Sequence, residues 1–222
     1  MKTSALTIYI LSFCFLISSC KTEDKDKNKV QKQNESIDTQ NSETFEVIEN
    51  ESIIEWKGSK PTGTHNGQIK IKSGEMKFAN EKLSAGKFII DMNSIHVMDL
   101  QGDEKDDLEN HLRGTIDGKE NHFFNVEKYP EALFVINQAQ NKGENYKIKG
   151  DLTIKAIKNP IDFEAQIYFG DDNKAVKLIS KEFTIDRTKW GIEFMSKSVF
   201  DDLKDEFIDD DISLKIILKA YK

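Results

Sequence analysis

The clearest pattern in this chain is an alternation of apolar and polar residues with a period of two. It is most regular over residues 146–156, where apolar or small residues take the even positions and polar residues the odd positions. Residues 214–220 repeat the pattern, with Ile217 as the one exception on the polar face. Such alternation predicts β-strands with one buried face and one face in water. Further strands are expected at 69–71, 75–78, 87–92, 132–139, 161–169 and 175–185.

These strands, about eight in all, are mostly separated by short turns such as 141–145 and 170–173. Gly143 suits a hairpin position that needs a positive φ. Residues 103–112 predict a short helix, because acidic residues lead and Leu108 and Leu112 stand four apart. A second helical turn is expected near 199–207. Two short helices cannot cover a whole sheet face, so a sheet of this size must close on itself to protect its edges. We therefore predict an all-β fold: an antiparallel barrel of about eight strands with one or two short helices. A barrel of this size can be wide enough for one ligand.

The N-terminus does not share this pattern. Residues 1–19 contain one charge, Lys2, and an apolar run that is too short to span a membrane, which predicts a secretory signal. The sequence Leu16-Ile17-Ser18-Ser19-Cys20 resembles the lipobox of bacterial lipoproteins, which implies that Cys20 is lipidated and becomes the new N-terminus. The alternative is an ordinary signal peptide with an incidental cysteine.

Residues 21–44 contain only two large apolar residues, Val30 and Ile37, and therefore predict a disordered tether. The predicted organisation is a lipoprotein signal peptide over 1–19, a lipidated flexible tether over 20–44 and a barrel domain over 45–222. Cys14 would leave with the signal and Cys20 would carry lipid, so no thiol would remain for redox or catalytic chemistry. The net charge of −7 over 222 residues, without a basic block, argues against nucleic acid as a partner.

A series of short motifs in residues 45–222 resembles, in this order, the YceI-like family. The motifs are Trp56-Lys57-Gly58, Gly63-Thr64-His65-Asn66-Gly67, residues 88–95, His111-Leu112, residues 123–126, residues 129–132, residues 150–155 and Asp186-Arg187-Thr188-Lys189-Trp190-Gly191. The resemblance implies a lipocalin-like barrel that binds polyisoprenoid or similar long amphipathic lipids in an elongated cavity. It does not imply catalysis, and we expect no cofactor. The chain departs from the family at Ala156, where members often have glycine; a small residue there leaves the predicted fold in place.

Four candidate ligand-binding residues come from two of these motifs. His65 stands between two glycines near the start of a strand, and could contact a lipid headgroup at the barrel mouth or bond to the backbone of a turn. Arg187 could pair with a phosphate, quinone or acid headgroup. Alternatively, Arg187 forms an ion pair or stacks on Trp190 and so closes the barrel. Asp186 and Trp190 complete this predicted group.

Phe124 is the fifth candidate ligand-binding residue. It belongs to an aromatic segment that follows the predicted helix, and this segment either docks the helix over one barrel end or gates the entry of a ligand. His111 and His122 are eleven residues apart and no thiol accompanies them, so we expect no metal site. His111 is expected to satisfy a carbonyl at the end of the helix. The run Asp209-Asp210-Asp211 is expected to be a solvated turn.

The leading functional hypothesis is a non-catalytic, membrane-anchored protein that holds the tail of a polyisoprenoid or similar lipid inside its barrel. Its expected location is the cell envelope, on the periplasmic face or the cell surface, with the membrane contacted through lipid on Cys20; a homodimer is left open. The alternative is a structural or partner-binding envelope lipoprotein whose barrel is filled by side chains. A third hypothesis is a lipid-modifying enzyme with His65 as base. The sequence contains no G-x-S-x-G, phosphate-loop or H-E-x-x-H motif.

Overall fold

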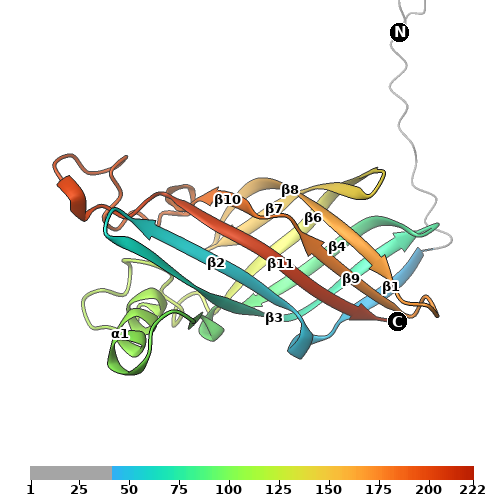
Figure 1. The fold of residues 1–222 in the computed structure, drawn as a ribbon, viewed down its shortest axis with the longest axis horizontal. Coiled ribbons are helices and arrows are strands. Elements are labelled where there is room, and N and C mark those ends of the chain that lie inside the picture. Colours follow the sequence, from blue (N-terminus) through green and yellow to red (C-terminus); the bar gives the residue numbers. More distant parts are fainter. Residues whose placement is uncertain (1–41) are drawn as a thin grey trace, which may run out of the picture. The chain divides into compact units, whose positions relative to one another are not determined.

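The computed structural model describes residues 42–222, and in this part of the chain it contains eleven β-strands and one α-helix (Figure 1). The predicted signal peptide, Cys20 and nearly all of the predicted tether lie outside the described residues. The strands are β1 Ser42–Val47, β2 Ile53–Lys60, β3 Gly63–Ala79, β4 Lys82–Asp91, β5 His96–Val97, β6 Glu131–Lys142, β7 Asn145–Ile154, β8 Ile157–Phe169, β9 Ala175–Ser180, β10 Phe183–Asp186 and β11 Asp211–Tyr221. The α-helix is α1, Gly102–Arg113.

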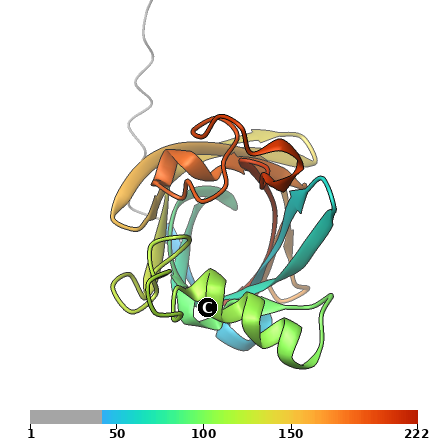
Figure 2. The same ribbon diagram turned by 90° about the vertical axis from the view of Figure 1, so that its left-hand side faces the viewer.

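The strands close into a ring of eight, in the order β11-β2-β3-β4-β6-β7-β8-β9, and β9 pairs back with β11. Every pairing is antiparallel. β1 continues the line of β2 between β11 and β3, and β10 continues the line of β9 beside β11. Figure 2 shows these strands surrounding a central axis. The predicted antiparallel barrel is confirmed.

The alternation of apolar and polar residues in the sequence corresponds to side chains that point alternately into the barrel and out of it. Along β7, the apolar side chains at even positions point inward and are buried, while Lys149 between them is exposed. The hairpin between β6 and β7 turns at Gly143, whose φ is +81°, and the backbone N–H of Gly143 donates to the side chain of Asn141. The positive φ that was predicted for this glycine is confirmed.

The limits of several elements differ from the prediction. Residues 69–71 and 75–78 belong to one long bent strand, β3, and residues 175–185 divide into β9 and β10 at Lys181 and Glu182. Helix α1 lies where it was expected. Residues 199–207 form turns and a short 3-10 segment, η5 Lys204–Glu206, rather than an α-helical turn. The reason is local: Asp202 and Lys204 have positive φ angles, which an α-helix of L-residues does not accommodate.

Ala156 sits in the β7–β8 turn with a φ of +62°, next to Lys155 with a φ of +49°. The turn therefore needs two residues in the left-handed backbone conformation, which glycine adopts most easily. The barrel forms despite the alanine, as predicted, although this conformation is strained for a residue with a Cβ.

The two ends of the barrel differ. One end is filled by Phe45, Phe78 and Phe169, whose rings meet edge to face at centroid distances of 5.2–6.1 Å. At the other end lie α1 and the segments 114–130 and 191–210 (Figures 1 and 2). Among residues 42–222, no helix has the length and apolar character needed to cross a membrane.

Candidate functional site

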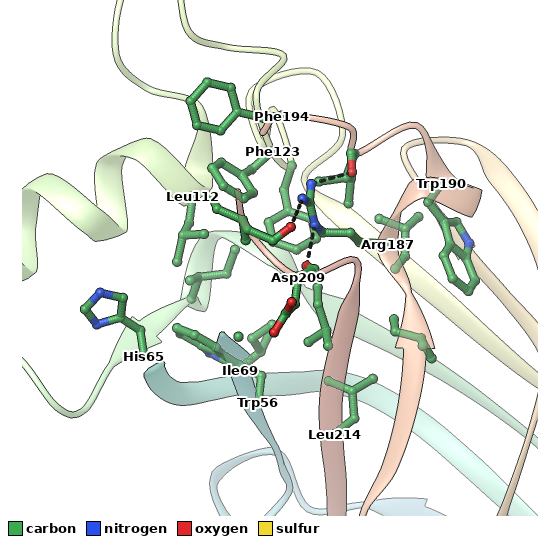
Figure 3. A pocket seen from close by; sticks show the side chains of 18 of the residues that line it. Trp56, His65, Ile69, Leu112, Phe123, Arg187, Trp190, Phe194, Asp209 and Leu214 are labelled. Atoms are coloured by element: carbon green, nitrogen blue, oxygen red, sulfur yellow. Dashed lines mark hydrogen bonds between the residues drawn. The ribbon is translucent and has the colours of Figure 1, made fainter. Parts of the chain in front are cut away.

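A cavity of about 400 Å³ occupies the barrel at the α1 end (Figure 3). Its wall is mostly apolar and is built from inward-facing strand residues, from α1 and from the segments that follow it; we call it the chamber. Lining residues include Ile54, Trp56, Ile69, Ile90, Ile95, Leu108, Leu112, Phe123, Phe124, Leu152, Ile154, Trp190, Ile192, Phe194, Ile212 and Leu214. Pockets of this size and polarity are typical of sites that bind small molecules.

Polar groups in the chamber wall are few. They come from the ends of strands and from the segments at the α1 end, and are Ser59, Lys60, His65, His111, Arg187, Glu206 and Asp209. A ligand with an apolar tail and a polar headgroup would therefore find the polar groups only at this end of the barrel.

Helix α1 is held in the wall by a buried carboxylate. Glu109 is 7% exposed, and its Oε1 accepts a 2.8 Å hydrogen bond from the backbone N–H of Val97 in β5. Its Oε2 accepts a 2.9 Å bond from Arg113, which also donates to the carbonyl of Ile95. Burial alone would raise the pKa of Glu109, but the Val97 N–H and the nearby cations lower it below its ordinary value. The charged form of Glu109 thus fixes the helix whose Leu108 and Leu112 face the chamber.

Arg187 lines the chamber, but its guanidinium is used within the protein. Its Nε donates to the carbonyl of Asp209, Nη1 to that of Ile192 and Nη2 to that of Ile208, at 3.0, 2.7 and 2.9 Å (Figure 3). The residue is 1% exposed, and Nη2 also lies 3.6 Å from Asp210 Oδ1. This geometry matches the ion-pair alternative. Asp210 therefore lies beside the buried guanidinium of Arg187. Residues 209–211 are thus not the solvated turn that was expected.

The motif that contains Arg187 forms a short 3-10 turn, η4 Arg187–Trp190. Asp186 caps its start, accepting hydrogen bonds from the Thr188 backbone N–H at 3.0 Å and from its hydroxyl at 2.6 Å. Gly191 ends the turn with a φ of +67°. Trp190 lines the chamber and its Nε1 donates to the carbonyl of Leu152 in β7 at 3.0 Å. The turn thus seats an indole ring against the barrel wall.

His65 lies at the β2–β3 end of the chamber and bonds to a side chain rather than to the backbone. Its Nδ1 is 2.8 Å from Asp99 Oδ2, and the other oxygen of Asp99 accepts from the Asn66 N–H at 2.9 Å. Burial would raise the pKa of Asp99, but the Asn66 N–H and His65 outweigh it, so the pKa lies below its usual range. The ring is oriented by Asp99 at the chamber edge, where it could meet a headgroup.

His111 and His122 are brought together by the fold. His111 Nε2 lies 2.9 Å from His122 Nδ1, and the ring of Phe194 stacks on His122 at 3.9 Å. His111 therefore bonds to the second imidazole, not to a carbonyl as expected. Burial lowers the pKa of His111, and nearby His122 and Lys119 lower it further. Within residues 42–222, no group of three or more His, Cys, Asp or Glu side chains is placed to hold a metal ion.

Of the five residues predicted to bind a ligand, four line the chamber: His65, Phe124, Arg187 and Trp190. Asp186 does not, because its carboxylate faces Thr188. Their contact with a ligand stays a prediction. Sequence reasoning missed Asp99, Glu109 and Phe194, which orient His65, α1 and His122. The periodic spacing of Leu108 and Leu112 marked the inner face of α1, but no local signal indicated that Glu109 would bond to β5.

Comparison with known proteins gives a consistent picture. A model of the YceI-like domain matches residues 29–220. Protein YceI from Escherichia coli is 31% identical over 107 residues, which are 48% of this chain and 51% of the relative, so the match spans about half the length of that protein. Among solved structures, BcnA from Burkholderia cenocepacia has a TM-score of 0.61 at 20% identity, covering 78% of this chain and 99% of BcnA. A polyisoprenoid binding domain from Saccharophagus degradans, implicated in plant cell wall breakdown, has a TM-score of 0.56 at 11% identity, covering 80% of this chain and 97% of that one. At these identities the structural likeness concerns the fold.

Proposed function

Because this chain belongs to the YceI-like family, we propose that it is a binding protein for a polyisoprenoid or similar long-chain amphipathic lipid. In this proposal the protein catalyses no reaction, and its barrel shields the lipid tail from water. It is anchored to an envelope membrane by lipid on Cys20, facing the periplasm or the cell surface.

The observation that carries the proposal is the chamber itself. It offers about 400 Å³ with a mostly apolar wall and polar groups at one end. Burying an apolar tail in such a space stabilises the complex by about 25 cal/mol per Å² of apolar surface removed from water, without any reaction chemistry. The solved polyisoprenoid binding domain with the same fold supports the choice of ligand class.

The side-chain-filled barrel, which was the alternative hypothesis, is less well supported. The half of the barrel that contains Phe45, Phe78 and Phe169 is filled in this way, but the half next to α1 holds the chamber. A lipid-modifying enzyme with His65 as base would use the His65–Asp99 pair. If a His65→Ala variant turned over a lipid substrate as fast as the unmodified protein, that hypothesis would be wrong.

The direct test is mass spectrometry of lipids extracted from the protein purified without detergent exchange. We expect a long-chain lipid in the extract, and binding of added isoprenoid to the delipidated protein. If no lipid copurifies and no added isoprenoid or fatty acid binds, the proposed function is wrong.

A further inference from the structure

The segment between η4 and β11 projects from the α1 end of the barrel. In Figure 1 it extends beyond the hairpin of β2 and β3, and in Figure 2 it lies across the barrel end from α1. The backbone N–H of Ile208 donates to the carbonyl of Met195 at 2.8 Å, which closes a loop of residues 196–207 that we call the tip. Both Met195 and Ile208 line the chamber, so the tip begins where the chamber wall ends.

The base of the tip is fixed by buried contacts. Arg187 donates to the carbonyl of Ile192, which precedes the tip. The same guanidinium donates to the carbonyls of Ile208 and Asp209, which follow the tip. Ser196, the first residue of the tip, is fully buried. One buried side chain therefore holds both ends of the loop, and the rest of the tip is presented on a firm base.

The tip exposes two neighbouring apolar side chains. Val199 and Phe200 are 45% and 47% exposed. The other exposed large apolar residues among 42–222 do not adjoin one another in the sequence, and they are Met98, Ile157, Tyr168 and Tyr221. Leu203 and Phe207 of the same tip are half-buried, and the ammonium of Lys197 lies 4.4 Å from the centroid of the Phe207 ring. The tip thus has a sheltered side, yet it leaves Val199 and Phe200 in water. One exposed apolar side chain is ordinary on a protein surface, but an adjacent pair on a projecting loop calls for a contact.

The charges around this pair indicate which surface it fits. The charged residues of the tip are two lysines and four acids: Lys197, Lys204, Asp201, Asp202, Asp205 and Glu206. The formal net charge of the tip is therefore −2. An anionic membrane repels such a tip, whereas zwitterionic headgroups offer partners of both signs. Phenylalanine and aliphatic side chains bury favourably at the boundary between headgroups and acyl chains. Because the tip also borders a chamber proposed to hold a membrane lipid, an electroneutral bilayer is the surface that fits both features.

We propose that the tip docks this protein on an electroneutral bilayer, with Val199 and Phe200 inserted among the headgroups while lipid enters or leaves the chamber. This inference rests on the proposed lipid-binding function and adds the surface at which the lipid is exchanged. An inserted tip holds the chamber wall at Met195 and Ile208 next to the bilayer, which shortens the path of an apolar tail through water. Two partly exposed side chains bury little area, so the docking is weak and reversible.

The first experiment measures docking by flotation with phosphatidylcholine vesicles. It uses the full chain carrying Cys20→Ser, so that no acyl anchor contributes. Phe200→Ser should lower the association constant about four- to tenfold, because the exposed half of a phenylalanine side chain is no longer there to be buried. Phe200→Leu should keep most of the binding. Tyr168→Ser is the matched control: Tyr168 is 49% exposed but stands in β8 beside Phe169, at the filled end of the barrel, so binding should not change.

The second experiment tests insertion and the effect of charge. Phe200→Trp places a fluorescent side chain in the tip, and brominated phosphatidylcholine should quench its emission. Tyr168→Trp should show no such quenching, and the background from Trp56 and Trp190 in the chamber wall is common to both variants. Replacing about a third of the phosphatidylcholine by phosphatidylglycerol should weaken docking at low salt, and added salt should reverse this loss.

A third measurement separates this inference from the function on which it rests. A prenol or fatty acid presented in solution should bind equally to the Phe200→Ser protein and to its parent, since the chamber is unchanged, but its transfer from vesicles should slow. Equal flotation of the Phe200→Ser and Tyr168→Ser proteins, as expected of a tip that docks on a protein, would overturn the docking role and leave lipid binding intact. Stronger binding to anionic vesicles, or weaker binding of the dissolved lipid to Phe200→Ser, would overturn it too. If no dissolved lipid binds the parent protein, the proposed function itself is wrong.

Discussion

The Nε2 atom of His111 in α1 lies 2.9 Å from Nδ1 of His122 in the segment that follows the helix, at the wall of the chamber. A hydrogen bond between two imidazole nitrogens requires one ring to donate and the other to accept, and a neutral His111 can take either part. Phe123 and Phe194 pack against His111, and Lys119 is the charged neighbour that acts on it. The pair therefore joins α1 to the segment that follows it, and the lowered pKa of His111 favours the neutral ring in the folded protein.

The first prediction concerns stability in acid. Burial, followed by His122 and Lys119, lowers the pKa of His111 in the folded protein, so between that pKa and the unfolded value of about 6.5 the unfolded chain binds more protons. The contribution of His111 to the free energy of unfolding should be present in full above about pH 6.5, and it should decrease as the pH drops toward the pKa of His111 in the folded protein. Urea unfolding at several pH values from neutral to mildly acidic measures this.

The control for this prediction is His111→Gln, which can still bond to His122 but does not titrate. Its stability should change less over the same pH range than that of the unmodified protein. Parallel pH profiles for the two proteins would contradict the assignment of the effect to His111.

Arg187 gives a prediction that separates a structural role from headgroup binding. The guanidinium donates to three backbone carbonyls, and lysine cannot reproduce this planar set of donors. Arg187→Lys should therefore lower the free energy of unfolding by about 2–3 kcal/mol, the cost of losing charge-assisted bonds to buried acceptors. The control is Lys189→Arg, because Lys189 is an exposed cation two residues further along the chain. This substitution should change the free energy of unfolding little. Lost lipid binding at unchanged stability would instead assign Arg187 to the ligand.

The barrel and its strands were predictable because their cause is local and periodic. The inward residues of β7, Tyr146, Ile148, Leu152 and Ile154, alternate with polar neighbours in the sequence itself. The candidate site was predictable only in part, since its geometry depends on contacts between distant segments. His65 was recognised from its motif, but its partner Asp99 is 34 residues away and belongs to no pattern. The strand break at Lys181 and Glu182 was missed because the apolar residues around it suggest one continuous strand.

Ala156 supplies a prediction about backbone strain. Its φ of +62° places a Cβ in the left-handed region, which costs about 1–2 kcal/mol for a residue other than glycine. Replacing Ala156 by glycine removes this strain, but part of the gain in stability is offset by the greater freedom of glycine in the unfolded chain. Ala156→Gly should therefore raise the free energy of unfolding by about 0.5–1 kcal/mol. Ala139→Gly, in strand β6, should lower it. Destabilisation by both variants in chemical unfolding would contradict the strain.

The membrane anchor gives the last prediction, which rests on the sequence alone because Cys20 lies outside the described residues. If Cys20 is lipidated, Cys20→Ser removes the acceptor thiol and the protein should move from the membrane fraction to the soluble fraction of lysed cells. The expected loss is nearly complete, since each buried methylene of an acyl chain contributes about 0.8 kcal/mol to membrane affinity. Cys14→Ser is the matched control, because Cys14 lies within the segment that would be removed, and this variant should stay with the membrane. Membrane association of the Cys20→Ser protein would mean that another part of the chain holds it there, and the anchoring proposal would be withdrawn while the chamber remained a site for lipid.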